Sequence, residues 1–434
     1  MPVPVQARML RARIDELSSA IDLQKALLKK LEDDRSFSQR QLNALMDPMA
    51  RLPLEISSEI FLQTLDPFLR ARPGAYYIPM LLLNICNTCT AIALATPALW
   101  SAIRIVSPCP GKGLMQLLPL WFTRAGTRPV SLSLTGDLDV LDDGVSATIW
   151  QHGCQLKHLE ISDYFDHSTA INLFQDTPGP LPLLETLEFD FPGESEDRGL
   201  IAPQILVLLS HAPNIVNCIF RDVQCLYSVA AMSEKVVVVP SLRRLLFQKH
   251  KDIPPYYNMG LLGCLSLPAL QTLSVGIVAS GGELRLLSFF KRSSPPLQEL
   301  TLSLDSTDFI ELHQCLPFVP TLSRLKIWAL EAQPVANLLA ALVESPSLLP
   351  NLRSLAIVTV TSDQPTTSPF ISASTWDMLL RLLSARPIEL HITSVPEPPA
   401  DVLAALRELA AGGLHIHIGD DEHNFLDFRS EETL

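Results

Sequence analysis

The chain has 434 residues, of which 47% are hydrophobic and 18% are charged, a composition that excludes a disordered chain and supplies a large folded core. With 33 basic and 46 acidic residues the net charge is −13, and no stretch is rich in Lys or Arg, so neither nucleic acid nor an anionic membrane is expected as the main partner. Eight scattered cysteines, and a start from Met1 to Pro4 without the apolar core of a signal peptide, favour a cytoplasmic or nuclear protein over a disulfide-bonded secreted one.

The first predicted element is a long helix from Arg8 to Met46, because this stretch contains no internal Gly or Pro. Its apolar residues recur at spacings of four and three, the pattern of a coiled-coil seam. The seam consists of Leu10, Ile14, Leu17, Ile21, Leu28, Leu31, Leu42 and Leu45. Gln24, Arg35 and Ser38 fall on the same seam and weaken it. Three outcomes remain open: homodimerisation through residues 8–46, a hairpin, and a solvated amphipathic helix.

A short helix is predicted next, beginning at Pro53, which suits the first turn of a helix because its missing N–H is not needed there. Its apolar side chains recur at spacings of three to five and form one stripe. The stripe consists of Ile56, Ile60, Phe61 and Leu65. Pro67 ends this helix.

A second short helix is predicted from Pro79 to the residue before Thr96. Its apolar face consists of Leu82, Ile85, Cys89 and Ile92. Residues 75–103 contain no charged side chain, which is long enough to suggest a membrane span, but prolines and polar residues interrupt the run. A buried helix pair explains the same apolar composition, so no membrane-spanning segment is expected.

The stretch from Leu52 to Ser101 resembles an F-box, in the F-box-like form common in fungal (basidiomycete-type) leucine-rich-repeat proteins. The matching segments are Leu52–Ile56, Ile60–Phe61, Ile85–Cys86 and Ile92–Ser101. The resemblance implies docking onto a Skp-type adaptor of a cullin–RING ubiquitin ligase, with the remaining chain holding a protein substrate. The family usually has an aromatic residue where this chain has Cys89, and a basic residue where it has Asn87.

The resemblance assigns adaptor contacts to residues of both short helices. They are Leu52, Pro53, Ile56, Ile60, Phe61, Leu65, Ile85 and Cys89. The other interpretation of this stretch is a helical cap that closes the end of a repeat array, since such arrays need caps. A cap explains the periodicity but not the Leu-Pro-x-Glu-Ile start, so adaptor docking is favoured.

Downstream, the pattern L-x-x-L-x-apolar recurs at intervals of about 25 to 31 residues, close to the period of leucine-rich repeats. The copies begin at Leu156, Leu184, Ile215, Leu242, Leu270, Leu297, Leu322 and Leu352, with terminal copies at Ile388 and Leu414. Each copy predicts one strand, and helical spacing predicts helices between most copies. The asparagine ladder of strict leucine-rich repeats is absent, so an irregular array is expected.

The expected fold class is therefore α/β. It combines a long coiled-coil-like helix, a small F-box-like helical domain, and an irregular leucine-rich-repeat solenoid with a parallel sheet. The expected boundaries are 1–47 for the helix, 48–105 for the F-box-like domain, 106–419 for the solenoid and 420–434 for an acidic tail.

Candidate target-binding residues follow from the strand period of two. If the fourth and sixth positions of each copy face the core, the third, fifth and seventh line a concave surface. The candidates there are Arg244, Gln248, Arg324, Lys326 and Trp328, because Arg and Trp are frequent interface anchors. The alternative is an ordinary solvated strand face.

No catalytic motif is found in the sequence. There is no phosphate-binding loop, G-x-S-x-G elbow or H-E-x-x-H zinc motif. Cys86 and Cys89 form a single C-x-x-C without a second pair or a histidine cluster, so no metal or cofactor is expected. The sequence thus predicts a non-catalytic substrate-recognition subunit of a Skp–cullin–F-box ubiquitin ligase, the alternative being a repeat scaffold with no role in ubiquitin ligation.

Overall fold

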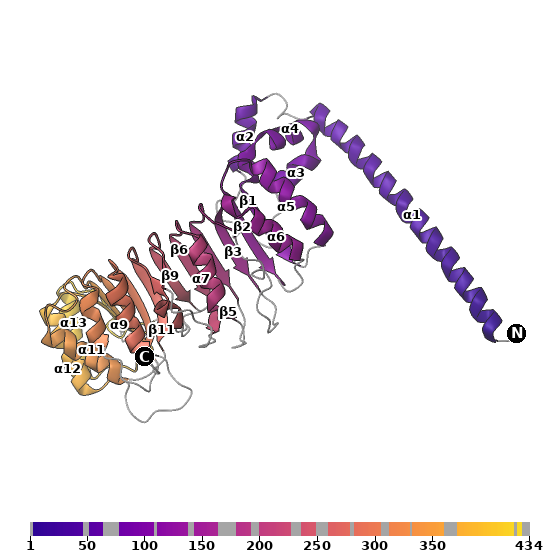
Figure 1. Ribbon diagram of the computed structural model, residues 1–434. Coiled ribbons are helices and arrows are strands. Elements are labelled where there is room, and N and C mark those ends of the chain that lie inside the picture. The colour runs from indigo at the N-terminus through magenta and orange to yellow at the C-terminus, as the bar shows by residue number, and fades with distance from the viewer. Residues whose placement is uncertain are drawn as a thin grey trace, which may run out of the picture. The chain divides into compact units, whose positions relative to one another are not determined.

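The structure is a computed structural model. It describes residues 3–46, 52–63, 78–107, 111–137, 143–163, 179–191, 199–226, 236–248, 259–277, 282–304, 312–329, 332–359, 371–420 and 423–427. The predicted α/β class is confirmed: a long N-terminal helix is followed by short helices and a twelve-stranded sheet (Figure 1). The chain divides into two compact units, one of Met1–Ile103 with Thr123–Arg128 and one of Arg104–Phe122 with Pro129–Leu434.

Helix α1 runs without interruption from Val3 to Met46. A single continuous helix rules out the hairpin that the sequence left open. Its large apolar side chains are exposed from Met9 to Met46. Near the carboxyl end, Arg40 Nη2 donates a hydrogen bond to Asn84 Oδ1 at 3.2 Å, within the same unit.

The rest of the first unit is built from α2 (Leu54–Gln63), α3 (Ile78–Ile85), α4 (Asn87–Ala95) and the 3-10 turn η2 (Pro97–Trp100). The prediction of one helix from Pro79 to the residue before Thr96 is wrong, because Cys86 adopts an extended conformation and separates α3 from α4. The Cys86 Sγ accepts a hydrogen bond from the Cys89 N–H at 3.3 Å and so caps α4. Ile85, the last residue of α3, is exposed, whereas Leu82 of α3 and Cys89 and Ile92 of α4 are buried.

The large sheet contains twelve strands in chain order. They are β1 (Ala102–Ser107), β2 (Val130–Gly136), β3 (Leu156–Ser162), β4 (Thr186–Asp190), β6 (Asn217–Arg221), β9 (Arg244–Gln248), β11 (Thr272–Ile277), β12 (Glu299–Leu304), β13 (Arg324–Ala329), β14 (Ser354–Thr359), β15 (Glu389–Thr393) and β16 (Ile416–Gly419). From β2 to β16 every pairing is parallel, as predicted. Two small parallel pairs lie beside it, β5 (Gly199–Ile201) with β7 (Gln224–Leu226) and β8 (Val237–Val238) with β10 (Leu265–Ser266).

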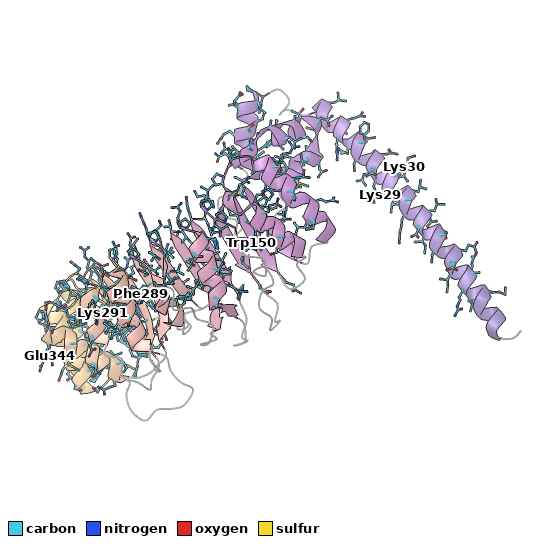
Figure 2. The ribbon with its side chains drawn as sticks, in the orientation of Figure 1. Lys29, Lys30, Trp150, Phe289, Lys291 and Glu344 are labelled. Atoms are coloured by element: carbon cyan, nitrogen blue, oxygen red, sulfur yellow. The ribbon has the colours of Figure 1, made fainter. Side chains whose placement is uncertain are left out.

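Helices and turns occupy most of the connections between the strands. They are α5 (Gly111–Ala125), α6 (Asp143–Gln151), η3 (Gly153–Gln155), α7 (Ala202–His211), α8 (Met259–Gly263), α9 (Gly282–Ser293), α10 (Leu312–Cys315), η6 (Leu316–Phe318), α11 (Ala332–Glu344), α12 (Ala373–Ala385) and α13 (Ala400–Ala411). Their apolar sides are buried, as Trp150 of α6 and Phe289 of α9 illustrate (Figure 2). A strand that is followed by a covering helix must be buried on that face, which explains the run of leucines in each copy.

The repeated leucines form columns across the sheet because neighbouring strands pair in register. From β4 to β14, the first apolar residue of each copy lies in the turn two residues before the strand and is buried. The sixth positions include Phe189, Phe220 and Phe247, whose rings stack with centroids 5.5 and 4.8 Å apart. Each repeat unit, a strand with the connection that follows it, thus completes the core of the next one. No single repeat unit could bury that core alone.

Side chains also connect successive repeat units, because they donate hydrogen bonds to backbone carbonyl oxygens of the preceding repeat. Asn214 Nδ2 donates to the Pro182 carbonyl oxygen at 2.8 Å, and Asn351 Nδ2 donates to that of Pro320 at 2.9 Å. Arg386, which follows α12, donates to the Ser345 and Leu348 carbonyl oxygens after α11, both at 2.8 Å. A cation at the carboxyl end of a helix is favourable because the last carbonyls there lack helical partners.

Candidate binding surfaces

The first candidate surface is an apolar row on helix α2. One side of this helix is buried in its own unit through Ser57 and Phe61. The neighbouring side carries Ile56 and Ile60, which are 50% and 42% exposed, and Leu52, just before the helix, is 40% exposed. Ile56 and Ile60 lie about one turn apart on the helix, and Leu52 precedes the first helical residue, Leu54; these three residues are the α2 apolar row. Exposed apolar groups aligned in this way are typical of an interaction surface.

Helix α3 also exposes apolar side chains at a spacing of four. Leu81 and Ile85 are exposed, whereas Pro79 and Leu82 are buried. Of the residues predicted to contact an adaptor, Ile85 is thus accessible together with the α2 apolar row. Pro53 is exposed as well. Its carbonyl oxygen accepts a hydrogen bond from the Ser57 N–H at 3.1 Å, and this bond marks the start of the helix.

Two other predicted adaptor contacts, Phe61 and Cys89, are buried in the helical unit. Cys89 lies on the packed side of α4 with Ile92 and Ala93. The Trp100 Nε1 donates to the Ala93 carbonyl oxygen at 2.8 Å and ties η2 to α4. We therefore correct their assignment from surface contacts to packing of the unit. Leu65 lies outside the described residues.

The second candidate surface is the open strand face, which we define as the third and fifth positions of the repeated copies. The third-position column consists of His158, Thr186, Asn217, Arg244, Thr272, Glu299, Arg324, Ser354 and Glu389. Every member of this column is exposed or half-buried. The column therefore presents a polar row with charges of both signs to solvent.

The seventh positions were expected to line the same surface, and from β11 to β16 this is wrong. All six are buried: Gly276, Ser303, Trp328, Val358, Thr393 and Gly419. At β16 the cause is visible, because residues 423–427 return over the strand and the Phe425 N–H donates to the Ile418 carbonyl oxygen at 2.8 Å. In these strands the accessible part of the open strand face therefore lies toward their amino ends.

The charged candidates on the open strand face have different partners. Arg324 forms an ion pair with Glu299, its register partner on β12. Lys326 Nζ lies 4.6 Å from the ring centroid of Trp328, which is only 6% exposed and so is covered rather than presented. Arg244 is exposed, and in the described part of the chain no ion pair involves it.

Gln248 is half-buried at the end of β9. Its carbonyl oxygen accepts the Asp222 N–H at 2.9 Å. Arg221, the register partner of Gln248 on β6, forms an ion pair with Glu188. In these early strands the acidic Glu188 is therefore paired with a basic residue of the next strand.

In the described part of the chain, grooves open at the amino ends of the strands, between the turns that precede them. The first, of about 510 Å3, is lined by Pro296, Gln298, Thr321, Ser323, Arg324, Asn351, Arg353, Ser354 and Glu389. The second, of about 500 Å3, is lined by Pro182, Leu183, Glu185, Asn214, Val216, Pro240, Ser241, Arg243 and Ala269. Arg243 and Arg353 are groove residues that the sequence analysis missed. Both occupy the second position of a copy, and a search for charged residues at that position would have identified them.

Titratable groups give no sign of a catalytic cluster in the described ranges. Burial lowers the pKa of His152, whose ring stacks on that of Phe122 with centroids 4.5 Å apart. His391 and His417 stack at 4.4 Å on neighbouring strands. Among the described residues, no three His, Cys, Asp or Glu side chains are grouped as metal ligands would be. In the same residues, no helix is both long and apolar enough to cross a membrane.

The geometry thus offers an apolar helical row, a polar strand face and two grooves, all suited to binding. Apolar rows favour a partner with a complementary apolar surface, and mixed charges favour an extended polar segment. Comparison with known protein families finds no matching family, and no curated protein matches the sequence either.

Proposed function

We propose that this chain is a non-catalytic substrate-recognition subunit of a Skp–cullin–F-box ubiquitin ligase. The observation that carries the proposal is the α2 apolar row, which stands in the segment that resembles an F-box and remains exposed. A helical unit that served only as a cap would use its apolar residues within the chain. In the proposal, this row and Ile85 bind a Skp-type adaptor, and the role implies a cytoplasmic or nuclear location.

We further infer that the repeat units form an irregular leucine-rich-repeat solenoid. Three observations support this: the parallel strands in chain order, the buried apolar columns, and the turn that places the first apolar residue before each strand from β4 to β14. The side-chain bonds of Asn214 and Asn351 to the preceding unit take the role that a regular asparagine ladder would have.

The open strand face and its grooves are the proposed target site. Arg324 and Arg353 lie between Glu299 and Glu389 across the strands, so a target segment can meet both signs of charge within a few residues. Such pairing gives specificity and orientation more than affinity. The subunit performs no bond chemistry in this proposal. It holds a lysine of the target close to the charged ubiquitin carrier, which raises the effective concentration of the reacting groups.

A second candidate function is a repeat scaffold that binds partners without ubiquitin ligation. It is favoured by Cys89 and Asn87, which replace the aromatic and basic residues usual in the family, and by the burial of Cys89. In this alternative, the α2 apolar row would bind another protein.

The deciding experiment is co-purification of the full chain with a Skp-type adaptor. Ile56→Asp with Ile60→Asp places two charges in the α2 apolar row, and we expect adaptor capture to fall by about tenfold or more, because a desolvated charge opposes an apolar contact. The control is Leu120→Asp, since Leu120 is an apolar residue of another helix, α5, and is at 58% somewhat more exposed than Ile56 and Ile60.

Thermal unfolding of both variants should match that of the unaltered chain, because exposed positions contribute little to stability. Absence of adaptor from the unaltered chain's complexes would favour the scaffold. Equal capture by both variants would remove the α2 apolar row from the interface.

A further inference from the structure

Helix α1 keeps its coiled-coil seam open to solvent along its length. The apolar seam residues between Leu10 and Leu45 are 48% to 83% exposed. The helix contacts its own unit from another side, because Arg40, which bonds to Asn84, stands at the position farthest from the seam in its heptad. The seam is therefore available to a partner while the helix stays attached.

A parallel pair of α1 helices in register is disfavoured by the polar residues of the seam. It would bring Arg35 of both copies into one layer, where two like charges repel each other. The flanking positions that meet in a parallel pair, five residues apart, include Arg13 with Ser18 and Asp34 with Gln39. None of these flanking pairs joins opposite charges.

An antiparallel pair, with residue 3 of one copy opposite residue 42 of the other, satisfies the same residues. Ile21 then meets Gln24 in the two central layers, and Leu17 meets Leu28 and Ile14 meets Leu31 in the layers on either side. Arg35 packs its aliphatic stem beside Leu10 and turns its guanidinium to solvent, as long basic side chains do at such positions.

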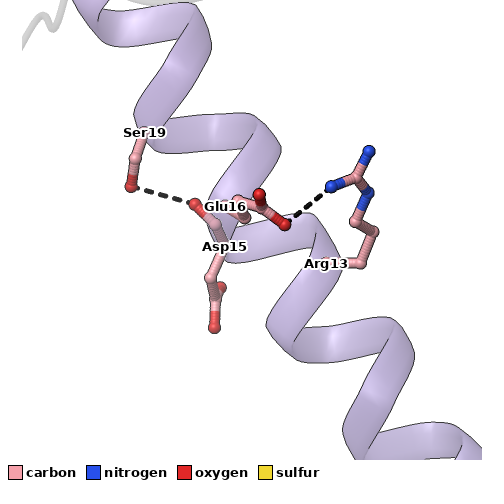
Figure 3. A network of polar contacts seen from close by, with 4 residues as sticks. All are labelled: Arg13, Asp15, Glu16 and Ser19. Carbon is pink, nitrogen blue, oxygen red and sulfur yellow. Dashed lines mark hydrogen bonds and ion pairs between the residues drawn. The ribbon is translucent and has the colours of Figure 1, made fainter.

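The flanking charges become complementary in this alignment. Arg11 faces Glu32 and Arg13 faces Asp34, and the twofold symmetry repeats both pairs. In the single chain, Arg13 Nη1 contacts Glu16 Oε2 at 2.7 Å (Figure 3). Both side chains of that contact are largely exposed, and such a pair contributes little, so it can be exchanged for one across the seam.

We propose that α1 joins two copies of this chain as an antiparallel two-stranded coiled coil. The paired length would be about 60 Å, from 1.5 Å of rise per residue, which is longer than most isolated helices need to associate. This proposal is independent of adaptor binding, because it uses neither the α2 apolar row nor the open strand face.

Sedimentation of the full chain tests the proposal. We expect a species of twice the 47.9 kDa mass of one chain in the micromolar range. Reversing one side of the charge pairs, as R11E with R13E, should weaken the dimer by about tenfold or more, because four attractive contacts become repulsive. E32R with D34R should have the same effect.

Mixing the two reversed chains provides the sharpest measurement. All four flanking pairs then join opposite charges, so the mixture should form a dimer of one copy of each, at least as tight as the unaltered one. The control is K29E with K30E, which changes the same number of charges at two residues that lie between the seam residues Leu28 and Leu31 in sequence and outside the flanking positions.

Three results would overturn the proposal. One is an unaltered chain that stays monomeric throughout the micromolar range. Another is a pair of reversed variants that each dimerise as well as the control. The third is a mixture that fails to reassociate, since a parallel or otherwise aligned pair would not be restored by these exchanges.

Discussion

At the scale of single residues, the end of the sheet depends on Gly419. Its φ is +158°, and a Cβ built there would overlap the carbonyl oxygen of His423. We expect Gly419→Ala to destabilise the chain by roughly 1 to 3 kcal/mol, because residues 423–427 would have to move off β16. Urea unfolding followed by circular dichroism measures this change.

The matched control for Gly419 is Gly113→Ala in helix α5, where no atom lies within 4 Å of the added carbon. Alanine there should be neutral or stabilising by up to about 1 kcal/mol, because it reduces the freedom of the unfolded chain. Equal unfolding midpoints for both variants would contradict the tight return over β16.

A second residue-scale prediction concerns pH and His152. Burial lowers the pKa of this imidazole in the folded chain, so the unfolded chain, with a pKa near 6.5, binds the proton more readily. Stability is therefore complete above 6.5 and falls as the pH decreases toward the lower folded value. His152→Phe keeps an aromatic ring beside Phe122 and should remove this part of the pH dependence.

Unfolding midpoints between pH 7 and pH 5 check the prediction, with His415→Phe, at an exposed histidine, as the control. If His152→Phe and the unaltered chain lose stability in parallel over this range, another group is responsible for the pH dependence.

At the scale of elements, successive repeat units are joined to each other by side chains at helix ends as well as by strand pairing. Arg386 spans from the end of α12 to two carbonyls after α11. Arg386→Met should cost about 1.5 to 3 kcal/mol, because charge-assisted hydrogen bonds are lost at a half-buried site. Arg381→Met, an exposed position on α12, should change stability by less than about 0.5 kcal/mol. Thermal melts that do not separate the two variants would argue against this bridge.

The strands were predictable from the sequence because period-two apolar spacing is a local property that the fold preserves. From β4 to β14 the L-x-x-L start lies two residues before the strand. The break at Cys86 was not predictable, because it depends on an extended residue whose sulfur caps the following helix. The spacing of three and four between apolar residues would by itself allow α3 and α4 to be one continuous helix.

The candidate sites were predictable only in part, because exposure depends on what covers a residue. Ile56 and Ile60 follow a helical spacing that is the same for a buried stripe and for an exposed one. Trp328 is buried at the end of β13 although its parity places it on the same strand face as Arg324. Parity fixes the face of a sheet but says nothing of segments that return over it.

At the scale of the whole molecule, the two candidate surfaces belong to different compact units. Substitutions in one unit should therefore leave binding by the other unchanged, since sites that share no interaction partners act additively. If α1 joins two copies, each assembly carries two open strand faces. A target with two recognition segments would then bind more tightly than either segment alone, by an amount set by the spacing of those segments.

The division between the units predicts separable losses in cells. Arg324→Glu with Lys326→Glu sets a carboxylate against Glu299 on the neighbouring strand and removes the Lys326 cation from the ring of Trp328. Target labelling should therefore fall by about tenfold, while adaptor labelling stays unchanged. Ile56→Asp with Ile60→Asp should do the opposite. Proximity labelling with each variant, beside Arg381→Glu on the helical side as the control, measures both sets at once. A variant of the open strand face that loses adaptor and keeps its targets would refute the assignment of the two surfaces, because the strand side would then bind the shared machinery.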